Sequence, residues 1–306
     1  MLKVFGHLSP DTDTVGSAIV WAWYLQEKCG LEASPFILGE LNSETRFVLE
    51  RFDISPPPLL PDITEQDQVT IVDTNNPQEL PGNISDATIV EIIDHHKLIG
   101  GLSTKAPPRV TIRPLACTAT IIYDLMGLRV NDLPHSIVGL MLSAILSDAL
   151  AFRSPTTTSH DQEVARTLAN ALEISIDNLA DNLFKAKSDI SCFSDKELIT
   201  MDSKKYAVGD TNIRVSVLET TTPDSVLARQ AGIIEAIADC VENESDVDDV
   251  LFFIVDILKG EATVFTYNDW TKRIISTSFS VSTNANTVTL PGIVSRKRQI
   301  LPALAG

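Results

Sequence analysis

The sequence has no long uninterrupted apolar stretch, few cysteines and few aromatic residues. No apolar run is long enough to cross a bilayer, and residues 1–7 lack the apolar core of a signal peptide, so we expect a cytoplasmic protein with no membrane partner. The four cysteines, Cys29, Cys117, Cys192 and Cys240, show no CxxC spacing. This argues against a disulfide framework or a zinc knuckle and favours reduced thiols that pack in the interior.

Basic residues are also scarce. The 24 lysines and arginines face 41 aspartates and glutamates, which gives a formal net charge of −17. Such a charge repels polyanions, so we expect no nucleic-acid partner. It does not exclude a small anionic substrate, because a local cluster of metal ions and basic side chains can outweigh distant carboxylates.

The length of 306 residues and the apolar content of 44% favour a folded protein of two domains. Short β-branched runs alternate with helical patterns in the first half, which predicts an α/β fold with a mostly parallel sheet. The expected strands are Leu2–Phe5, Val69–Val72, Thr88–Ile93 and Val110–Ile112, and the expected helices are Ser17–Cys29, Ala116–Met126 and Ser136–Leu146.

The pattern changes after Asn178–Lys187, and residues 185–190 are the best candidate for a hinge. We expect a first domain over residues 1–188 and a smaller α/β domain over residues 192–306. The second domain should contain strands Ile213–Leu218 and Val250–Ile257, a short helix around Asp195–Met201 and one long helix, Asp224–Val241.

Acidic and imidazole side chains follow several predicted strands directly. His7, Asp11 and Asp13 follow the first strand, Asp73 follows the second, and Asp94-His95-His96 follow the third. Ligands of open α/β sheets bind at the carboxyl ends of the strands, where these residues would gather. Asp148, within an almost wholly apolar helix, is a further candidate.

Each of these residues also has an ordinary structural explanation. Asp11 and Asp13 could cap a helix, Asp73 could start an Asx turn, and His95 and His96 could be a hydrogen-bonded pair at a strand end. Asp148 is harder to explain in this way, because a carboxylate in apolar surroundings needs a cation or hydrogen bonds to compensate its charge.

The set as a whole predicts a metal site, because independent turns would have no reason to place acids and imidazoles at several strand ends. Oxygen donors with some imidazole favour Mn²⁺ over Ca²⁺ or thiolate-bound zinc. So many carboxylates need more than one cation. Two ions about 3.5–4 Å apart, bridged by a carboxylate and a water, would provide a hydroxide for in-line attack on phosphorus.

These motifs resemble those of the DHH phosphoesterase superfamily. Lys204, in Asp202-Ser203-Lys204, and Ser295-Arg296-Lys297 resemble the substrate-binding motifs of family II, manganese-dependent inorganic pyrophosphatases. The resemblance covers nearly the whole chain and implies an enzyme that splits pyrophosphate into two phosphates. The implied architecture is a DHH catalytic domain followed by a DHHA2-type substrate-binding domain.

The resemblance also implies a role for each residue of the site. His7 and Asp11 would bind one metal ion, Asp13, His95 and Asp148 the other, and Asp73 would bridge the two ions. His96, Lys204, Arg296 and Lys297 would hold the pyrophosphate oxygens, and Asp94 would orient ligands. Asp13, Asp73, His96, Lys204 and Arg296 would be the residues on which catalysis depends.

The implied cofactors are two Mn²⁺ ions per subunit, with Co²⁺ as a possible substitute and Mg²⁺ accompanying the substrate. The implied assembly is a homodimer. Thr74 departs from the pattern, because many family members have histidine after the bridging aspartate. The basic run from Arg296 to Arg298 could alternatively be a solvated patch, although its apolar flanks favour a packed segment.

The main alternative is a DHH-type oligonucleotide phosphodiesterase or nuclease, which would share the metal half of the site. Such relatives carry a glycine-rich Gly-Gly-His type motif late in the chain, and this sequence has none. A non-catalytic metal-binding or phosphate-binding protein with the same fold is the weakest alternative, because the ligand motifs are complete.

Overall fold

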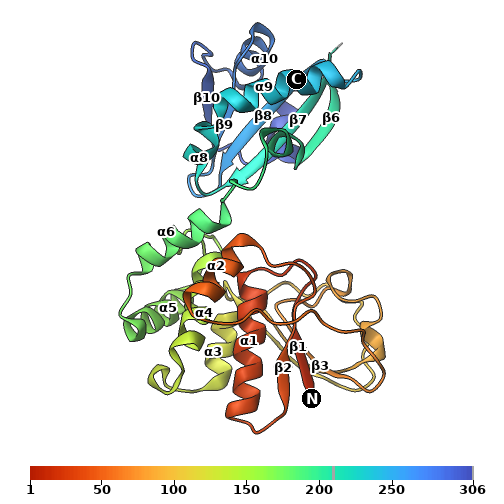
Figure 1. The fold of residues 1–306 in the computed structure, drawn as a ribbon, viewed down its shortest axis with the longest axis vertical. Coiled ribbons are helices and arrows are strands. Elements are labelled where there is room, and N and C mark those ends of the chain that lie inside the picture. Colours follow the sequence, from red (N-terminus) through yellow and green to blue (C-terminus); the bar gives the residue numbers. More distant parts are fainter. Residues whose placement is uncertain (209–210, 305–306) are drawn as a thin grey trace. The chain divides into compact units, whose positions relative to one another are not determined.

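The computed structural model describes residues 1–208 and 211–304, and it divides the chain into two units, Met1–Lys187 and Ser188–Gly306. Each unit has its own five-stranded sheet and its own apolar core (Figure 1). Among the described residues, no helix is both long and apolar enough to cross a membrane.

The sheet of the first unit is parallel throughout, with the strand order β2-β1-β3-β4-β5. Its strands are β1 (Leu2–Phe5), β2 (Ala33–Pro35), β3 (Gln68–Val72), β4 (Thr88–Asp94) and β5 (Arg109–Ile112). The chain crosses from β1 to β2 in one direction and continues through β3 in the other. The sheet therefore has a topological switch point between β1 and β3. The predicted α/β class with a mostly parallel sheet is confirmed.

Both faces of this sheet are buried, which explains why the strands read as continuous apolar runs. Val4, Val72 and Ile93 face the larger core cluster, whereas Phe5 and Ile71, their neighbours in the chain, face a second cluster on the opposite side. Alternation along each strand places successive side chains on opposite faces.

Helices cover one face of the sheet, as Figure 1 shows. They are α1 (Thr12–Glu27), α2 (Ser43–Arg51), α3 (Thr118–Met126), α4 (His135–Asp148), α5 (Ser159–Leu172) and α6 (Ile176–Lys187). Irregular chain and the short 3₁₀ turns η1 (Pro77–Glu79) and η2 (Ile84–Asp86) contribute Leu80 and Ile84 to the cluster on the other face. A third 3₁₀ turn, η3 (Val130–Asp132), precedes α4.

Helix α1 begins five residues before the predicted start at Ser17, because Asp11 caps it. The Asp11 Oδ1 atom accepts a hydrogen bond from the Thr14 N–H at 2.9 Å. The predicted end of α3 before Gly127 is confirmed, since Gly127 takes the left-handed conformation with φ of 59°. Strand β2 and helices α2, α5 and α6 were not predicted.

The second unit has a mixed sheet in the order β10-β9-β8-β7-β6, in which only β7 and β8 pair in parallel among the described strands. The strands are β6 (Ser203–Val208), β7 (Thr211–Thr220), β8 (Asp249–Asp256), β9 (Glu261–Phe265) and β10 (Thr287–Pro291). The predicted α/β class of this part is confirmed.

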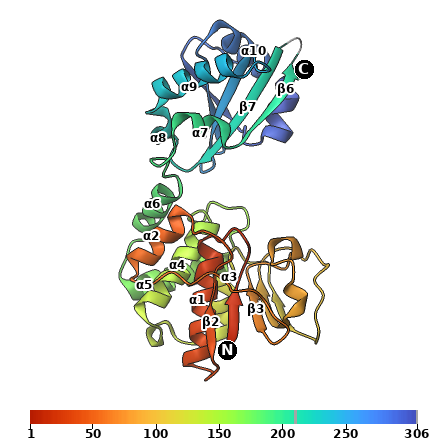
Figure 2. The ribbon, with the colours of Figure 1, turned by 45° about the vertical axis from the view of Figure 1, so that its right-hand side comes forward.

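Helices lie on both faces of this second sheet (Figure 2). They are α7 (Asp195–Thr200), α8 (Pro223–Leu227), α9 (Gln230–Asn243), α10 (Asp269–Phe279), the π-helical turn η4 (Arg296–Ile300) and α11 (Leu301–Leu304). Phe252 and Ile254 face one core cluster, while Leu251 and Phe253 face the other.

The prediction of one long helix over Asp224–Val241 was wrong, because α8 and α9 are separate helices. Arg229 lies between them, and its guanidinium donates to Asp195 Oδ1 and to the carbonyl oxygens of Ile190 and Phe193. These three bonds hold the junction against α7. The apolar periodicity of the sequence continues across the break and gives no sign of it.

Gly6 joins β1 to His7 at a point where no side chain fits. A Cβ atom there would lie 2.6 Å from Thr14 Cγ2 and 2.8 Å from the Val72 carbonyl oxygen. We expect Gly6→Ala to destabilise the protein by about 1–3 kcal/mol through overpacking. Gly82→Ala is the matched control, because its Cβ would meet nothing within 4 Å. Urea unfolding of both variants tests this, and equal stabilities would contradict it.

Candidate metal centre

The candidate site lies where β1, β3 and β4 end, at the topological switch point. His7 follows β1 after Gly6, Asp73 directly follows β3, and Asp94 closes β4 ahead of His95. Helix α1 adds Asp11 at its N-terminal cap and Asp13 in its first turn, and α4 adds Asp148 as its last residue. The six predicted metal ligands, His7, Asp11, Asp13, Asp73, His95 and Asp148, therefore converge from five segments of the first unit.

These six ligands form two groups that share Asp73, and a third group that contains Asp73 joins it to His95 and His96. In the first group, His7 Nε2 lies 3.6 Å from Asp11 Oδ2 and 3.4 Å from Asp73 Oδ2. The donor atoms of this group all lie within 4.8 Å of one another. That spacing suits a single cation, with one imidazole and two carboxylates as ligands.

The second group contains Asp13, Asp73, His95 and Asp148. His95 Nε2 lies 3.4 Å from Asp73 Oδ1, 3.7 Å from Asp148 Oδ2 and 4.0 Å from Asp13 Oδ2. Asp73 thus turns Oδ2 toward His7 and Oδ1 toward His95. One carboxylate with an oxygen in each group has the geometry of a bridging ligand.

Asp73 occupies an unfavourable backbone conformation. Its φ of 62° lies in the left-handed region, which is costly for a residue with a side chain. The Asp73 N–H bonds to the Ile93 carbonyl at 2.8 Å, and its two carboxylate oxygens accept hydrogen bonds from Thr14 Oγ1 at 2.6 Å and Thr118 Oγ1 at 3.0 Å. Strain at such a point is typical of functional sites, where the surrounding structure holds a residue in place.

Asp13 is fully buried and is held by the N-terminus of α3. Thr118 N–H donates to its Oδ2 at 2.6 Å and Ala119 N–H to its Oδ1 at 3.0 Å, while Ser17 Oγ donates to Oδ1 at 2.8 Å. The free N–H groups of a helix N-terminus favour an anion. They fix this carboxylate without neutralising it fully.

Two histidines of the site are strongly basic in the absence of bound cations. Burial lowers the pKa of His7, but the hydrogen bonds to Asp11 and Asp73 raise it overall to about 10. Burial also lowers the pKa of His95, and its contacts with Asp73 and Asp13 raise it to about 9. Two imidazolium groups therefore supply positive charge to the carboxylates at neutral pH.

The pKa values of the carboxylates are also shifted, upward for Asp13 and Asp148 and downward for Asp73. Burial, reinforced by the charge of Asp73, raises the pKa of Asp13 to about 7. Burial and the charge of Asp13 hold the pKa of Asp148 well above its usual range. Burial would raise the pKa of Asp73 too, but the hydrogen bonds with His7 and His95 hold it below its usual range. Full ionisation of this cluster therefore requires more positive charge than the chain supplies, and divalent cations fit that requirement.

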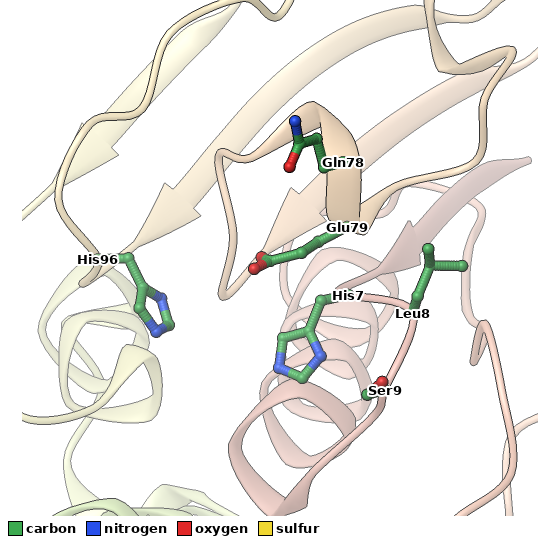
Figure 3. Close-up of a pocket in the computed structure, with 6 residues that line it drawn as sticks. All are labelled: His7, Leu8, Ser9, Gln78, Glu79 and His96. Carbon is green, nitrogen blue, oxygen red and sulfur yellow. The ribbon is translucent and has the colours of Figure 1, made fainter. Parts of the chain in front are cut away.

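His96 is more exposed than the other residues and lines a cavity of about 360 Å³ together with His7 (Figure 3). Its ring Nδ1 lies 2.9 Å from Asp94 Oδ1, and the Asn75 amide donates to Asp94 Oδ2 at 2.5 Å. Asp94 thereby fixes the His96 ring from a fully buried position. Figure 3 shows the rings of His7 and His96 turned toward the same space.

Thr74 is buried and does not contribute to the metal-ligand groups. Its Oγ1 donates to Glu79 Oε2 at 2.7 Å and accepts from the Asn76 N–H at 3.1 Å. The carboxylate of Glu79 reaches into the cavity between the two histidines (Figure 3). The hydroxyl therefore fixes an acidic side chain beside the site.

The remaining predicted residues lie in the second unit. Lys204, Arg296 and Lys297 line one pocket of about 550 Å³. The Arg296 guanidinium pairs with Asp202 Oδ1 at 2.7 Å and donates to the Asp202 carbonyl oxygen at 2.8 Å. This anchoring leaves Lys204 and Lys297 as the exposed cations of that pocket. Two residues of the basic run, Arg296 and Lys297, therefore line the pocket, whereas Arg298 is exposed and lies outside it.

Sequence reasoning missed the residues that hold the ligands in place. Thr14, Thr118, Ala119 and Asn75 all bond directly to Asp13, Asp73 or Asp94. In the sequence, Thr14 and Thr118 look like ordinary helix-start residues and Asn75 like part of a turn. Only the tertiary arrangement reveals their partners.

Known proteins match the chain along almost its full length. A model described as the DHH family, N-terminal domain, matches residues 2–145, and one for the DHHA2 domain matches residues 181–306. A protein of Shouchella clausii, named probable manganese-dependent inorganic pyrophosphatase, is 38% identical over 98% of this chain and 96% of its own length. A protein of Oceanobacillus iheyensis with the same name is 35% identical over 98% and 97%.

A solved structure agrees with these relatives. The crystal structure of a putative family II inorganic pyrophosphatase from Methanococcus jannaschii is 32% identical, with a TM-score of 0.63. The match covers 100% of this chain and 98% of that one.

The raised pKa values of the histidines predict that Mn²⁺ binds more tightly as pH rises. His7 and His95 must lose protons to act as ligands, and with pKa values of about 10 and about 9 both are protonated at pH 6–8. Each ion displaces one histidine proton, so we expect the affinity for each Mn²⁺ to rise at least about tenfold per pH unit, and the binding of both together roughly a hundredfold. Competition with a chelator of known protonation behaviour measures this. An affinity that does not change with pH would contradict the protonated histidines.

Proposed function

Because the chain belongs to the family II, manganese-dependent inorganic pyrophosphatases, we propose that it hydrolyses inorganic pyrophosphate to two phosphates. One observation carries the proposal. Two groups of oxygen and imidazole donors share the single carboxylate of Asp73 at the carboxyl edge of a parallel sheet. A site of this kind is suited to phosphoryl transfer with a pair of divalent cations.

We propose two Mn²⁺ ions per subunit, one held by His7, Asp11 and Asp73 and the other by Asp13, Asp73, His95 and Asp148. The mixture of hard carboxylate oxygens with imidazole supports Mn²⁺, and Co²⁺ is a suitable substitute. When bound, such a pair supplies a nucleophile at neutral pH and neutralises charge on the phosphate oxygens. Mg²⁺ would accompany the substrate.

We propose that His96 of the first unit and Lys204, Arg296 and Lys297 of the second bind oxygen atoms of pyrophosphate. The shared pocket of the three basic residues supports their common role. Arginine suits it because its planar fork can bind two oxygens at once. In this proposal residues 1–188 form the catalytic domain and residues 192–306 the substrate-binding domain.

Two finer expectations, a homodimer and a cytoplasmic location, stay predictions. The edge strand β5 supports a dimer, because Val110 is 51% exposed on a strand that, among the described residues, pairs only with β4. Natural proteins usually protect or cover such an edge.

Asp73 should be the costliest single ligand to replace, because its carboxylate serves both donor groups and reduces the repulsion between two cations. We expect Asp73→Asn to lose bound Mn²⁺ as well as turnover. Metal analysis of the purified variant measures the first effect and phosphate release the second. Two ions still bound with wild-type affinity would contradict the bridging role.

Arg296→Ala and Lys297→Ala should keep their Mn²⁺ content while kcat/KM for pyrophosphate falls. A lost charge-assisted contact typically costs about 1.5–3 kcal/mol, or roughly one to two powers of ten. Arg298→Ala is the matched control, because Arg298 is exposed in the same turn and does not line the pocket. Phosphate release gives the rates.

The same assay distinguishes the nuclease alternative. A short oligonucleotide is offered beside pyrophosphate to the wild type and to these variants. Preference of the wild type for the oligonucleotide, or pyrophosphate kinetics that do not change in Arg296→Ala and Lys297→Ala, would overturn the pyrophosphatase assignment.

A further inference from the structure

Asp161 is a fully buried carboxylate that lies outside the predicted site. It stands in the first turn of α5, where Thr158 N–H and Thr158 Oγ1 donate to its Oδ2 at 2.9 Å and 2.6 Å. These bonds belong to an ordinary capping box. A capping box alone does not require a buried charge at its third helical position, because an uncharged glutamine can also accept the bond from the cap N–H.

Asp161 also accepts two bonds from a distant part of the chain. The Ala116 N–H donates to its Oδ2 at 3.1 Å, and Thr120 Oγ1 donates to its Oδ1 at 2.8 Å. Residues 115–120, here called the bracing segment, are thus attached to one carboxylate near both of their ends. Four donors satisfy the buried charge, which would otherwise be strongly unfavourable.

The bracing segment contacts three of the proposed metal ligands. Thr118 and Ala119 donate their N–H groups to Asp13, and Thr118 Oγ1 donates to Asp73 Oδ1. The Leu115 carbonyl oxygen lies 3.1 Å from His95 Nδ1. A displacement of this segment would therefore move the ligands of the second group together.

The link to His95 runs through a single peptide group. The carbonyl oxygen of the Leu115–Ala116 peptide accepts a hydrogen bond from His95 Nδ1, and the N–H of the same peptide donates to Asp161 Oδ2. Because a peptide group is planar, holding its N–H also fixes the direction of its carbonyl. A carbonyl oxygen can only accept, so His95 Nδ1 carries the proton and Nε2 is left to face Asp73 and Asp148.

We propose that Asp161 is a positioning residue of the metal site, which acts through the bracing segment on His95, Asp13 and Asp73. The inference rests on the proposed binding of Mn²⁺. A carboxylate that accepts the N–H also strengthens the opposite carbonyl as an acceptor, which makes His95 a better ligand. Asp161 touches neither substrate nor metal ligand directly.

The test measures Mn²⁺ affinity and stability separately in the full chain. Affinity is obtained from the electron paramagnetic resonance signal of free Mn²⁺, and the melting temperature is measured with chelator present. We expect Asp161→Ala to weaken Mn²⁺ binding by about 10–100-fold, the usual effect of removing a partner that orients a ligand. Activity should return in part at high Mn²⁺ concentration.

Thr120→Val and Thr158→Val form a matched pair that separates positioning from mere stability. Each removes one hydroxyl that donates to Asp161, but only Thr120 belongs to the bracing segment. Both should lower the melting temperature. Only Thr120→Val should weaken Mn²⁺ binding. If Asp161→Ala does not fold, the comparison of the two threonine variants still tests the inference.

Wild-type affinity in Thr120→Val, or equal losses of affinity in the two threonine variants, would overturn the inference. With Asp161→Ala folded, unchanged Mn²⁺ binding would do the same while leaving the proposed function intact. A wild-type protein that binds no Mn²⁺ would remove the proposed function and the inference together.

Discussion

Carboxylates that lie buried or half-buried side by side repel one another, and this repulsion is the constraint around which the first unit is built. Asp13, Asp73 and Asp148 each have an oxygen within 4.8 Å of His95 Nε2. In surroundings of low polarity, several ionised carboxylates are stable side by side only when positive charges lie between them. The histidines supply that charge as protons, and divalent cations would supply it more strongly. The same interaction therefore accounts for the perturbed pKa values and for the expected metal dependence.

The backbone near the carboxylates is held in unfavourable conformations. Asp73 has a φ of 62°, and residues 150–152, just after Asp148, have φ values of 47°, 49° and 70°. Side chains disfavour this region, so each such residue costs free energy that the neighbouring packing must offset. Gly6 permits the close approach of the ends of β1 and β3 at the site, because a Cβ atom at this position would not fit between them. The strain at Asp73 and the close approach at Gly6 both lie at the strand ends that place His7 beside Asp73.

The convergence of the proposed ligands could be predicted from the sequence because their signal is local. An acid or imidazole directly after a buried apolar strand is visible in the chain itself, as at Asp73 and His95, and parallel strands bring such residues to one edge. The residues that hold those ligands have no local signal. Thr118 is the first residue of a helix, a common position for threonine. Asp161 belongs to a capping box, which explains its presence in the sequence without reference to a metal site. The break between α8 and α9 was missed for the same reason, because it depends on the contacts of Arg229 with Ile190, Phe193 and Asp195.

The second unit combines a local basic pocket with the negative net charge of the whole protein. With a net charge of −17, the protein repels anions at a distance, yet Lys204, Arg296 and Lys297 share one pocket. Fields of separated surface charges fade within about 8–10 Å at physiological salt, whereas cations in contact with a bound anion are hardly screened. A small anion can therefore gain the full local attraction while avoiding most of the distant repulsion. A polyanion would extend over the acidic surface and meet that repulsion along its length. Arg296, held by Asp202 in a fixed direction, adds a geometric requirement to this selection by size.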